Sequence, residues 1–345
     1  MKPREALRVG LVGCGEIADV HIPAILKLEH VELVAVCDLD EDLARKVARR
    51  YSVGSYYTDL SELLLKGQLD LVDITAPPRT HLALSIKAME AGCHVLVEKP
   101  MALNLDEADN MIEAAKNNRV RLGVFHSFLF LPAVIKAKSM IEKGAIGDLI
   151  GASIDHCDAR DWPLIQNRDH WCHKLPGGIF GEMLPHPLYL ATAFLGRLEA
   201  NTVYSRKLSG YDWLAADELR VILEGENSVA TIRASVNAPR SLMALDVFGT
   251  KASLHVSISS GVVIRYVGSR RKRFSDGLEN IGTAYQWLAG TASGALRVAL
   301  RPYGIGHHNL IEGFVESLQN DTELPVTAEE GREVTRLYQA IASQI

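Results

Sequence analysis

Long hydrophobic runs are absent from this chain, and so is an excess of basic charge. None of its apolar stretches approaches the length that crosses a bilayer, and the first residues run into a strand-like segment without the pattern of a signal peptide. The 345 residues carry a formal net charge of −5, which gives no basic field for phosphate backbones. We therefore expect that the protein does not span a membrane, is not secreted and does not bind nucleic acid.

Cysteines are few, and their number is odd. The five are Cys14, Cys37, Cys93, Cys157 and Cys172. They are predicted to be reduced thiols of a cytoplasmic protein. The stretch that contains His156, Cys157, His170, Cys172 and His173 has neither a closed ligand spacing nor a paired Cys-x-x-Cys. We therefore predict no metal site.

Two patterns divide the sequence, which is long enough for two domains of ordinary size and is 48% hydrophobic. In the first pattern, short apolar runs alternate with helical periodicity. We predict strands near 7–12, 31–37, 55–57, 69–75, 94–97 and 120–125, and helices near 17–28, 40–51, 79–91 and 104–118. Such alternation implies a doubly wound parallel sheet covered by helices on both faces. Residues 1–125 are therefore predicted to form an α/β domain of the Rossmann type.

After residue 126 the pattern changes, and strand-like runs are separated by turns without intervening helices. They lie at 150–154, 219–223, 229–236, 242–248, 254–258 and 262–267, and they predict an α+β domain over 126–345 with a mostly antiparallel open sheet. The alternation within 229–236 indicates one buried face and one mixed face. Because an open sheet face often pairs with another subunit, we expect a homodimer or homotetramer through this sheet. For residues 275–306 we expect a helix plus loops near an active site or an interface.

A glycine motif ends the first predicted strand and opens an amphipathic helix. Gly13 would permit the tight turn, Gly15 would let the backbone reach a pyrophosphate, and Ala18 would let the helix pack closely on the strand. Asp38 ends the next predicted strand, where a carboxylate binds the adenosine ribose hydroxyls and repels a 2′-phosphate. These residues predict NAD as the cofactor, with NADP less favoured. The cofactor-binding residues predicted on the loop are Gly13, Gly15, Glu16, Ile17 and Ala18.

Glu98, Lys99 and Pro100 end a later predicted strand, at the carboxyl edge where ligands bind in such folds. With the rest of residues 71–100 they closely resemble the Gfo/Idh/MocA oxidoreductase family, of which Glu-Lys-Pro is the most specific mark. The resemblance covers essentially the whole chain. It includes, in the family's order, Leu131-Pro132, Lys143-Gly144-Ala145-Ile146-Gly147, Gly177-Gly178, His186 and Thr322-Glu323-Leu324-Pro325-Val326.

The resemblance implies roles for these residues. Lys99 matches the lysine that binds the substrate hydroxyl and lowers its pKa, Glu98 matches a glutamate that helps to position the cofactor, and the bond before Pro100 is often cis. His186 matches the histidine that serves as general acid or base for the hydroxyl proton, a role that suits imidazole. The cofactor-binding residues predicted beyond the glycine loop are Asp38, Thr75, Ala76, Pro77, His81, Glu98 and Lys99.

The chain departs from the family pattern around His186. Glu182 stands where the family usually has aspartate, and we predict that it orients His186 or binds a sugar hydroxyl as a third catalytic residue; a solvated helix residue is the alternative. Pro185 and Pro187 flank the histidine, which is tolerated in a first helical turn or at an irregular break. The predicted substrate-binding residues are His126, Phe128, Trp171 and Tyr189.

Together these patterns predict an NAD-dependent oxidoreductase. Hydride would pass between nicotinamide C4 and a secondary alcohol or ketone of a sugar, inositol or sugar derivative, with Lys99 and His186 handling the hydroxyl proton. Two alternatives stay open: an NAD-dependent redox-cycling glycosidase of the same family, with Glu182 and Tyr189 as candidate acid and base, and a non-catalytic NAD-binding regulator. Retained NAD that does not exchange would favour the glycosidase, whereas the presence of Lys99 and His186 argues against the regulator.

Overall fold

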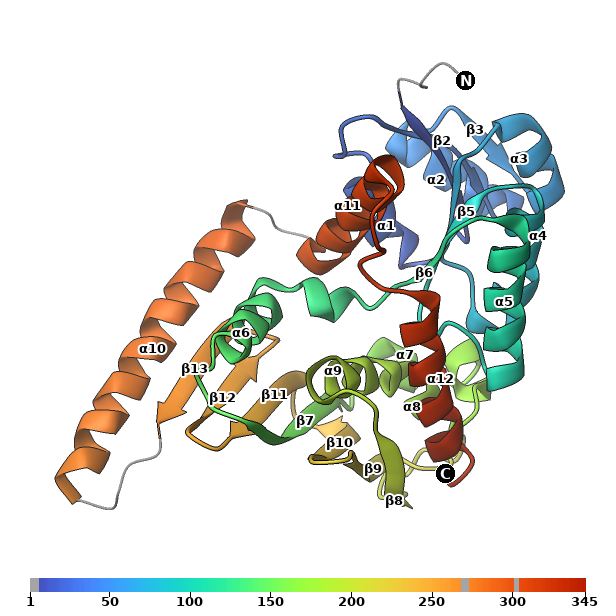
Figure 1. Cartoon of the computed structure of the whole chain (residues 1–345). Coiled ribbons are helices and arrows are strands. Elements are labelled where there is room, and N and C mark those ends of the chain that lie inside the picture. The colour runs from blue at the N-terminus through green and yellow to red at the C-terminus, as the bar shows by residue number, and fades with distance from the viewer. Residues whose placement is uncertain (1–5, 268–272, 301–303) are drawn as a thin grey trace. The chain divides into compact units, whose positions relative to one another are not determined.

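Residues 6–267, 273–300 and 304–345 are described by a computed structural model (Figure 1). The chain divides into two units, of which the first comprises Met1–Ser127 with Gly304–Arg336 and the second comprises Phe128–Tyr303 with Leu337–Ile345. The sequence analysis placed residues 304–336 with the C-terminal part. In the structure they belong to the first unit because helix α11 (Ile305–Asn320) contacts α1 (Ala18–Ile25), and its fully buried Phe314 packs on Gly123.

A six-stranded parallel sheet forms the core of the first unit, as predicted. Its strands are β1 (Leu7–Val12), β2 (Val31–Cys37), β3 (Ser55–Tyr57), β4 (Leu71–Ile74), β5 (His94–Val97) and β6 (Leu122–Val124). Their order across the sheet is β3-β2-β1-β4-β5-β6, and every neighbouring pair is parallel. The winding direction therefore reverses between β1 and β4, and ligands of such sheets bind beyond the carboxyl ends of the strands at this switch point.

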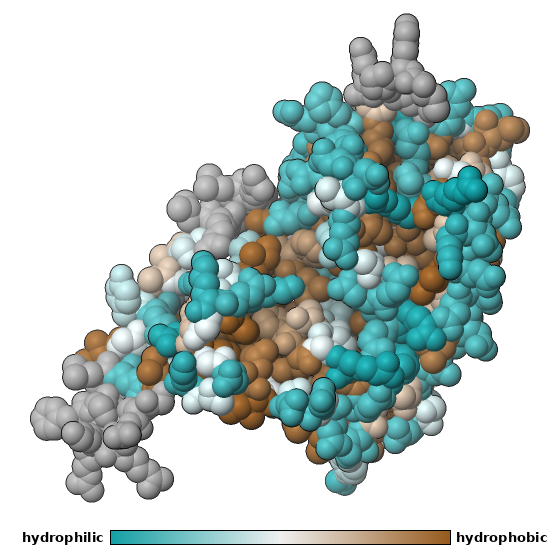
Figure 2. Space-filling view, viewed as in Figure 1, coloured by the Kyte–Doolittle hydropathy of each residue, from teal (hydrophilic) through white to brown (hydrophobic). Residues whose placement is uncertain are grey.

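Helices connect these strands, and side-chain caps begin three of them. Besides α1 they are α2 (Glu41–Tyr51), α3 (Leu60–Gly67), α4 (His81–Glu90), α5 (Leu105–Asn118) and the 3-10 turns η1 (Pro78–Thr80) and η2 (Ser127–Phe130). The caps of α2, α3 and α5 are Asp40, Asp59 and Asn104, whose oxygens accept backbone N–H groups of the first turn. Helix α5 buries Ala108, Met111 and Ala115, and its outer surface is mainly hydrophilic in Figure 2. Helix α3 was not predicted.

A seven-stranded sheet forms the core of the second unit, and it is mostly antiparallel as predicted. Its strands are β7 (Leu149–Ala159), β8 (Glu199–Arg206), β9 (Glu218–Glu224), β10 (Val229–Ala238), β11 (Leu242–Gly249), β12 (Ala252–Ser257) and β13 (Val262–Val267). Their order is β13-β12-β11-β7-β10-β9-β8, and among these described strands only β7 and β10 pair in parallel. Strand β8 was not predicted, because it lies at the sheet edge and its mainly polar residues are exposed or half-buried.

One face of this second sheet is buried, and the other is largely exposed. In β10, Ala230 and Ile232 are buried while Val229, Thr231 and Arg233 are exposed. On the buried side α9 contacts β7. The helices of this unit up to that point are α6 (Pro132–Glu142), α7 (Pro163–Gln166), η3 (Trp171–Lys174), α8 (Phe180–Met183) and α9 (Pro185–Leu195).

The segment 275–306, for which a helix plus loops was expected, contains most of one long helix. Helix α10 (Arg273–Leu300) contacts β13 (Figure 1), residues 301–303 lie outside the described residues, and α11 follows. The last helix is α12 (Ala328–Ala342). Within the described residues, no helix combines the length and apolar character that crossing a membrane would require.

Candidate cofactor-binding and catalytic site

The glycine loop leaves β1 at the switch point of the first sheet. Gly13 has a φ of +103°, which glycine adopts readily, and a Cβ atom there would lie 2.5 Å from the backbone nitrogen of Ala76. Thr75 holds this close approach, because its hydroxyl donates to the carbonyl oxygen of Gly13 over 2.6 Å. Gly15 differs, since it is exposed and a Cβ atom there would meet no protein atom within 4 Å. The loop is therefore packed against protein at Gly13 and open to a ligand at Gly15.

Asp38 follows β2, and its carboxylate faces the glycine loop. Its Oδ2 accepts the backbone N–H of Cys14 over 2.7 Å, and its Oδ1 accepts that of Asp40 over 2.9 Å. The carboxylate is thereby held near the start of α1, where Glu16 is exposed and Ile17 is the N-cap residue. An open glycine loop that leads into a helix N-terminus, with a carboxylate beside it, fits the pyrophosphate and adenosine ribose of a dinucleotide.

The turn after β4 carries more of the predicted cofactor residues. Thr75 is buried, and Ala76 and Pro77 are half-buried. His81 begins α4 and is fully buried; its ring nitrogens lie 2.8 Å from the carbonyl oxygen of Ala76 and 2.9 Å from that of Pro100. Burial lowers the pKa of His81. This side chain thus ties the turn after β4 to the turn after β5.

Glu98, Lys99 and Pro100 follow β5, and the Lys99–Pro100 peptide bond is cis. The Glu98 side chain is buried; its Oε2 accepts the backbone N–H of Lys99 over 2.9 Å, and its Oε1 lies 3.0 Å from Nε2 of His21. Burial opposes ionisation of this carboxyl, but the hydrogen bond from His21 and its charge lower the pKa of Glu98 to about 2. The Glu98 carboxylate is therefore ionised, and it anchors the backbone of Lys99.

Sequence reasoning missed the partner of Glu98. His21 lies in α1 and is fully buried, and its Nδ1 lies 2.8 Å from Oδ2 of Asp73 in β4. Burial disfavours a charged ring, yet Asp73 and then Glu98 raise the pKa of His21 to about 10. The signal that could have found this pair is a histidine and an aspartate at positions where the surrounding helix and strand are apolar.

Other rings surround His21 within the first unit. The ring centroid of Phe125 lies 4.1 Å from that of His21, and the centroid of His307 lies 5.6 Å from it. Burial lowers the pKa of His126 to about 3, although the charge of Glu98 acts in the opposite direction. Burial, followed by the charge of His21, lowers the pKa of His307 to about 4. Ligand atoms of His21, Glu98 and His307 lie within 4.8 Å of one another, but both ring nitrogens of His21 already face carboxylate oxygens.

His186 lies in the second unit, in the first turn of α9. Its Nδ1 lies 2.8 Å from the hydroxyl oxygen of Tyr189, and its ring stacks on Phe128 with centroids 4.4 Å apart. Tyr189 is only 1% exposed, and its hydroxyl oxygen accepts the backbone N–H of Phe128 over 3.1 Å. Pro185 begins the helix and Pro187 falls in its first turn, where two prolines are tolerated. Three predicted site residues, His186, Tyr189 and Phe128, are thus brought together.

For Glu182 and Trp171, the described interactions are with residues other than His186, Tyr189 and Phe128. Glu182 is half-buried in α8, and its charge, after burial, raises the pKa of the Tyr338 hydroxyl. Trp171 begins η3, and its ring centroid lies 5.1 Å from that of His170. The structure adds His156 to the surroundings of His186, since their ring centroids are 5.6 Å apart. The sequence analysis had considered His156 only as a metal ligand.

Two profiles of one protein family match the chain. Residues 7–126 match the oxidoreductase family, NAD-binding Rossmann fold, and residues 134–255 match the GFO/IDH/MocA C-terminal domain. Oxidoreductase P35 of Formosa agariphila is 33% identical over 195 residues, which are 55% of this chain and 61% of that protein. Myo-inositol 2-dehydrogenase of Thermotoga maritima is 31% identical over 190 residues, 55% of each chain. The chain thus spans less than two thirds of the length of these relatives.

A solved structure shows the same fold. The WlbA dehydrogenase of Bordetella pertussis, in complex with NADH and UDP-GlcNAcA, matches with a TM-score of 0.79 at 21% identity, over 97% of this chain and 95% of that one. The fold agrees with the two profile matches, and the Glu98-Lys99-Pro100 turn lies at the sheet edge where the glycine loop also begins. The chain therefore belongs to the GFO/IDH/MocA family of oxidoreductases.

Proposed function

We propose that the protein is an NAD-dependent oxidoreductase. Its reaction moves a hydride between nicotinamide C4 and a secondary alcohol or ketone of a sugar, an inositol or a sugar derivative. The observation that carries this proposal is that Gly15, the Asp38 carboxylate and Lys99 all follow strands at the carboxyl edge of one parallel sheet. The polyol class is supported by the myo-inositol 2-dehydrogenase among the relatives.

Asp38 supports NAD over NADP. Its carboxylate, held by the amides of Cys14 and Asp40, is an acceptor for ribose hydroxyls and a negative charge against a 2′-phosphate. The cofactor, when bound, supplies the carbon that accepts or donates the hydride. We expect Asp38→Ala to bring the Kd values for NAD and NADP closer together, as measured by calorimetry. An unchanged ratio of the two would remove Asp38 from the site.

Lys99 and His186 handle the hydroxyl proton in this proposal. The Lys99 ammonium binds the substrate oxygen and stabilises negative charge that develops on it. The His186 imidazole accepts or returns the proton. Because its Nδ1 is bound to the Tyr189 hydroxyl, we assign the transfer to Nε2. Tyr189 then positions His186, Glu182 remains a proposed orienting carboxylate, and the proposed substrate contacts are His126, Phe128 and Trp171.

Turnover can be followed by the change in nicotinamide absorbance. A panel of inositols, aldoses, keto-sugars and nucleotide sugars would be offered with NAD or NADP. We expect at least one class to react, and we expect Lys99→Ala and His186→Ala each to keep NAD binding and lose most turnover. Lys66→Ala, which removes an exposed lysine paired with Glu62 in the first unit, is the matched control and should react like the wild type. Full activity of a Lys99→Ala/His186→Ala double variant would refute the mechanism.

The same assay separates the rival functions. NAD that copurifies, does not exchange and is not consumed while a glycosidic bond is cleaved would indicate the redox-cycling glycosidase. Binding of NAD without reaction on any member of the panel would indicate the regulator. Either result would replace the dehydrogenase proposal.

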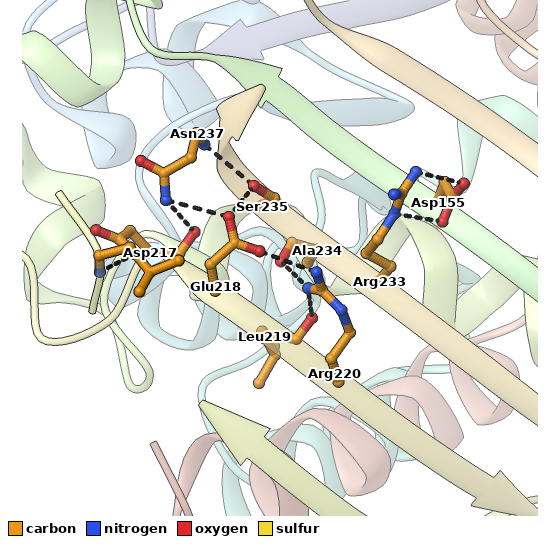
Figure 3. A network of polar contacts seen from close by, with 10 residues as sticks. Asp155, Asp217, Glu218, Leu219, Arg220, Arg233, Ala234, Ser235 and Asn237 are labelled. Atoms are coloured by element: carbon orange, nitrogen blue, oxygen red, sulfur yellow. Dashed lines mark hydrogen bonds and ion pairs between the residues drawn. The ribbon is translucent and has the colours of Figure 1, made fainter. Parts of the chain in front are cut away.

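We further propose that copies of the chain pair through the exposed face of the second sheet. Polar side chains on this face are already paired within the chain (Figure 3). Arg233 makes two contacts with Asp155, of 2.9 and 2.7 Å, and Glu218 binds Arg220 and Ser235. Charges that are already paired cost less to bury than single ones. Exposed apolar side chains on the strands of this sheet add a hydrophobic component: Ile150, Tyr204, Ile222, Val229 and Phe248.

The oligomeric state tests this surface. Light scattering after size exclusion should give a dimer or tetramer for the wild type and a monomer for Ile222→Glu/Val229→Glu. Leu65→Glu changes an exposed leucine of the first unit and should leave the assembly intact. A monomeric wild type would remove the proposal.

We also propose a cytoplasmic location. All five cysteines are buried, and none of them is in a disulfide, as is usual for proteins of reducing compartments. A thiol assay on protein purified without reductant and then denatured should find five free thiols, and disulfides in that sample would contradict the proposal.

A further inference from the structure

The first unit contains a charged cluster in its interior. His21 is 0% exposed, Asp73 is 1% exposed and Glu98 is 6% exposed. Each ring nitrogen of His21 faces one carboxylate oxygen, at 2.8 Å for Asp73 and 3.0 Å for Glu98. An ionised carboxylate only accepts hydrogen bonds, so a ring that bonds one carboxylate through each nitrogen must carry both protons. With both carboxylates ionised, the ring is therefore an imidazolium.

We propose that His21, as a buried imidazolium, is a positioning residue that holds Glu98 and, through it, the backbone of Lys99. The chain of contacts runs from Asp73 through His21 to one oxygen of Glu98, and from the other oxygen to the Lys99 N–H at 2.9 Å. It connects α1, β4 and the end of β5. The catalytic consequence rests on the proposed function of Lys99, whereas the charge of His21 does not.

The imidazolium offsets one of the two negative charges of the carboxylates. The Oδ1 atom of Asp73 is buried and has no hydrogen-bond partner among the described residues, so His21 supplies the described bond to this side chain. With a neutral side chain at position 21, two ionised carboxylates would share a buried site, and one of them would have to take up a proton or move. Either change alters the bond from Glu98 to the Lys99 backbone.

The groups that face the cluster from neighbouring elements are aromatic rings and neutral histidines, and Lys99 contributes a charge from its end. Within the cluster itself, His21 is the cation. Phe125, beyond β6, packs its ring against that of His21. His126 beside it and His307 from α11 have pKa values lowered by burial, to about 3 and about 4, and are neutral. Lys99 acts on Glu98 by its charge. The raised pKa of His21, about 10, agrees with the geometry.

NMR of the imidazole nitrogens tests the charge without any turnover. The full chain would be labelled in histidine, and the His21 signals assigned by their loss in His21→Gln. We expect both nitrogens to stay protonated at about pH 8, where an unperturbed histidine is neutral. A neutral tautomer of His21 at that pH would overturn the proposal, whatever the enzyme's activity. A protonated ring in a protein without turnover would instead place the failure in the proposed function.

Kinetics tests the positioning role. His21→Gln should lower kcat roughly tenfold to a hundredfold, because Lys99 is misplaced, while the Kd for NAD changes little. His21→Gln/Asp73→Asn removes one negative charge together with the cation, so it should recover part of the kcat that the single variant loses. The double variant should also fold under conditions in which the single variant is partly unfolded. A purely structural role would overturn the proposal: the single variant would then lose kcat only in proportion to the folded fraction seen by circular dichroism, and the double variant would recover nothing.

A bound metal is the competing outcome, since His21, Glu98 and His307 offer ligand atoms within 4.8 Å of one another. Metal analysis of the purified protein and titration with Co²⁺ address it. One equivalent of metal, whose removal by a chelator changes the His21 signals, would overturn the imidazolium. Protein without bound metal and with a protonated His21 would support it.

Discussion

Gly13 and Gly15 are two residues apart, and the structure predicts opposite consequences when each is changed to alanine. A Cβ atom at Gly13 would lie 2.5 Å from the nitrogen of Ala76 and 2.6 Å from the carbonyl carbon of Thr75, which are backbone atoms that cannot rotate away. The φ of +103° adds strain for any residue with a side chain. A Cβ atom at Gly15 meets no protein atom within 4 Å.

The expected magnitudes differ accordingly. For Gly13→Ala, the unfavourable backbone conformation costs about 1–3 kcal/mol, and the clash costs about 1–3 kcal/mol more. The midpoint of thermal unfolding should therefore fall by roughly 5–20 °C, at about 2–4 °C per kcal/mol for a unit of this size. Gly15→Ala should change the free energy of unfolding by less than about 0.5 kcal/mol. It should nevertheless weaken NAD binding about tenfold or more, a loss of about 1.4 kcal/mol, because the methyl group occupies the space that the pyrophosphate needs.

Two assays separate these effects: thermal unfolding of the protein without cofactor, and calorimetric titration with NAD. Gly92→Ala is a control for positive φ alone, since that glycine has a φ of +81° and no protein atom near its Cβ position. Gly92→Ala should lower the free energy of unfolding only by the cost of the backbone conformation, about 1–3 kcal/mol. Wild-type affinity of Gly15→Ala would refute the placement of the pyrophosphate at this loop, and an unchanged unfolding midpoint of Gly13→Ala would refute the packing argument.

Three further changes have defined outcomes. Tyr189→Phe removes the hydroxyl bound to His186 and to the Phe128 N–H, so kcat should fall with NAD affinity unchanged and stability should drop by about 1–3 kcal/mol; full kcat would contradict the positioning role. Gly123→Ala places a Cβ atom against the ring of buried Phe314 and should cost about 1–3 kcal/mol in urea unfolding. Because His126 has a pKa of about 3 when folded against 6.5 otherwise, its contribution to stability is full above pH 6.5 and is lost as the pH falls towards 3, at about 1.4 kcal/mol per pH unit; denaturant titrations should find His126→Phe less acid-sensitive than the wild type.

The sequence predicted the first sheet well because its central strands are largely buried on both faces. Such strands are continuous apolar runs, and the glycine motif marks where the first of them ends. The same reasoning failed at β8 and α3. Strand β8 is an edge strand with mainly polar residues. In α3 the exposed Leu65 follows Leu63 and Leu64, and this run of three leucines obscures the helical spacing of buried Leu60 and Leu63.

The positions of candidate site residues were predictable where they follow directly from a strand end. Gly13, Gly15, Asp38 and Lys99 are of this kind. Tyr189 is not: it was predicted to touch substrate, but it lies three residues after His186 on a helix, which puts its hydroxyl beside that imidazole while its ring is buried. The direction of a side chain on α9 depends on how the helix packs, which the sequence does not state.

His21 was missed for a different reason. It lies 52 residues from Asp73 and 77 from Glu98, and the three meet only because β1 pairs with β4 and β4 with β5. Each alone looks like an ordinary polar residue. That the three form one cluster can be inferred only after the strand order is known.

The segment 304–336 makes the same point about domain boundaries. Arg121, beside β6, donates to the carbonyl oxygens of Ser317 and Thr322, which are about two hundred residues away in the chain, and Gly123 forms a bridge with Thr327. The same segment brings the ring of His307 to Phe125 and His21. The surroundings of the histidine–carboxylate cluster are therefore completed by the far end of the chain, so the first 127 residues alone would leave one side of that cluster without its covering ring.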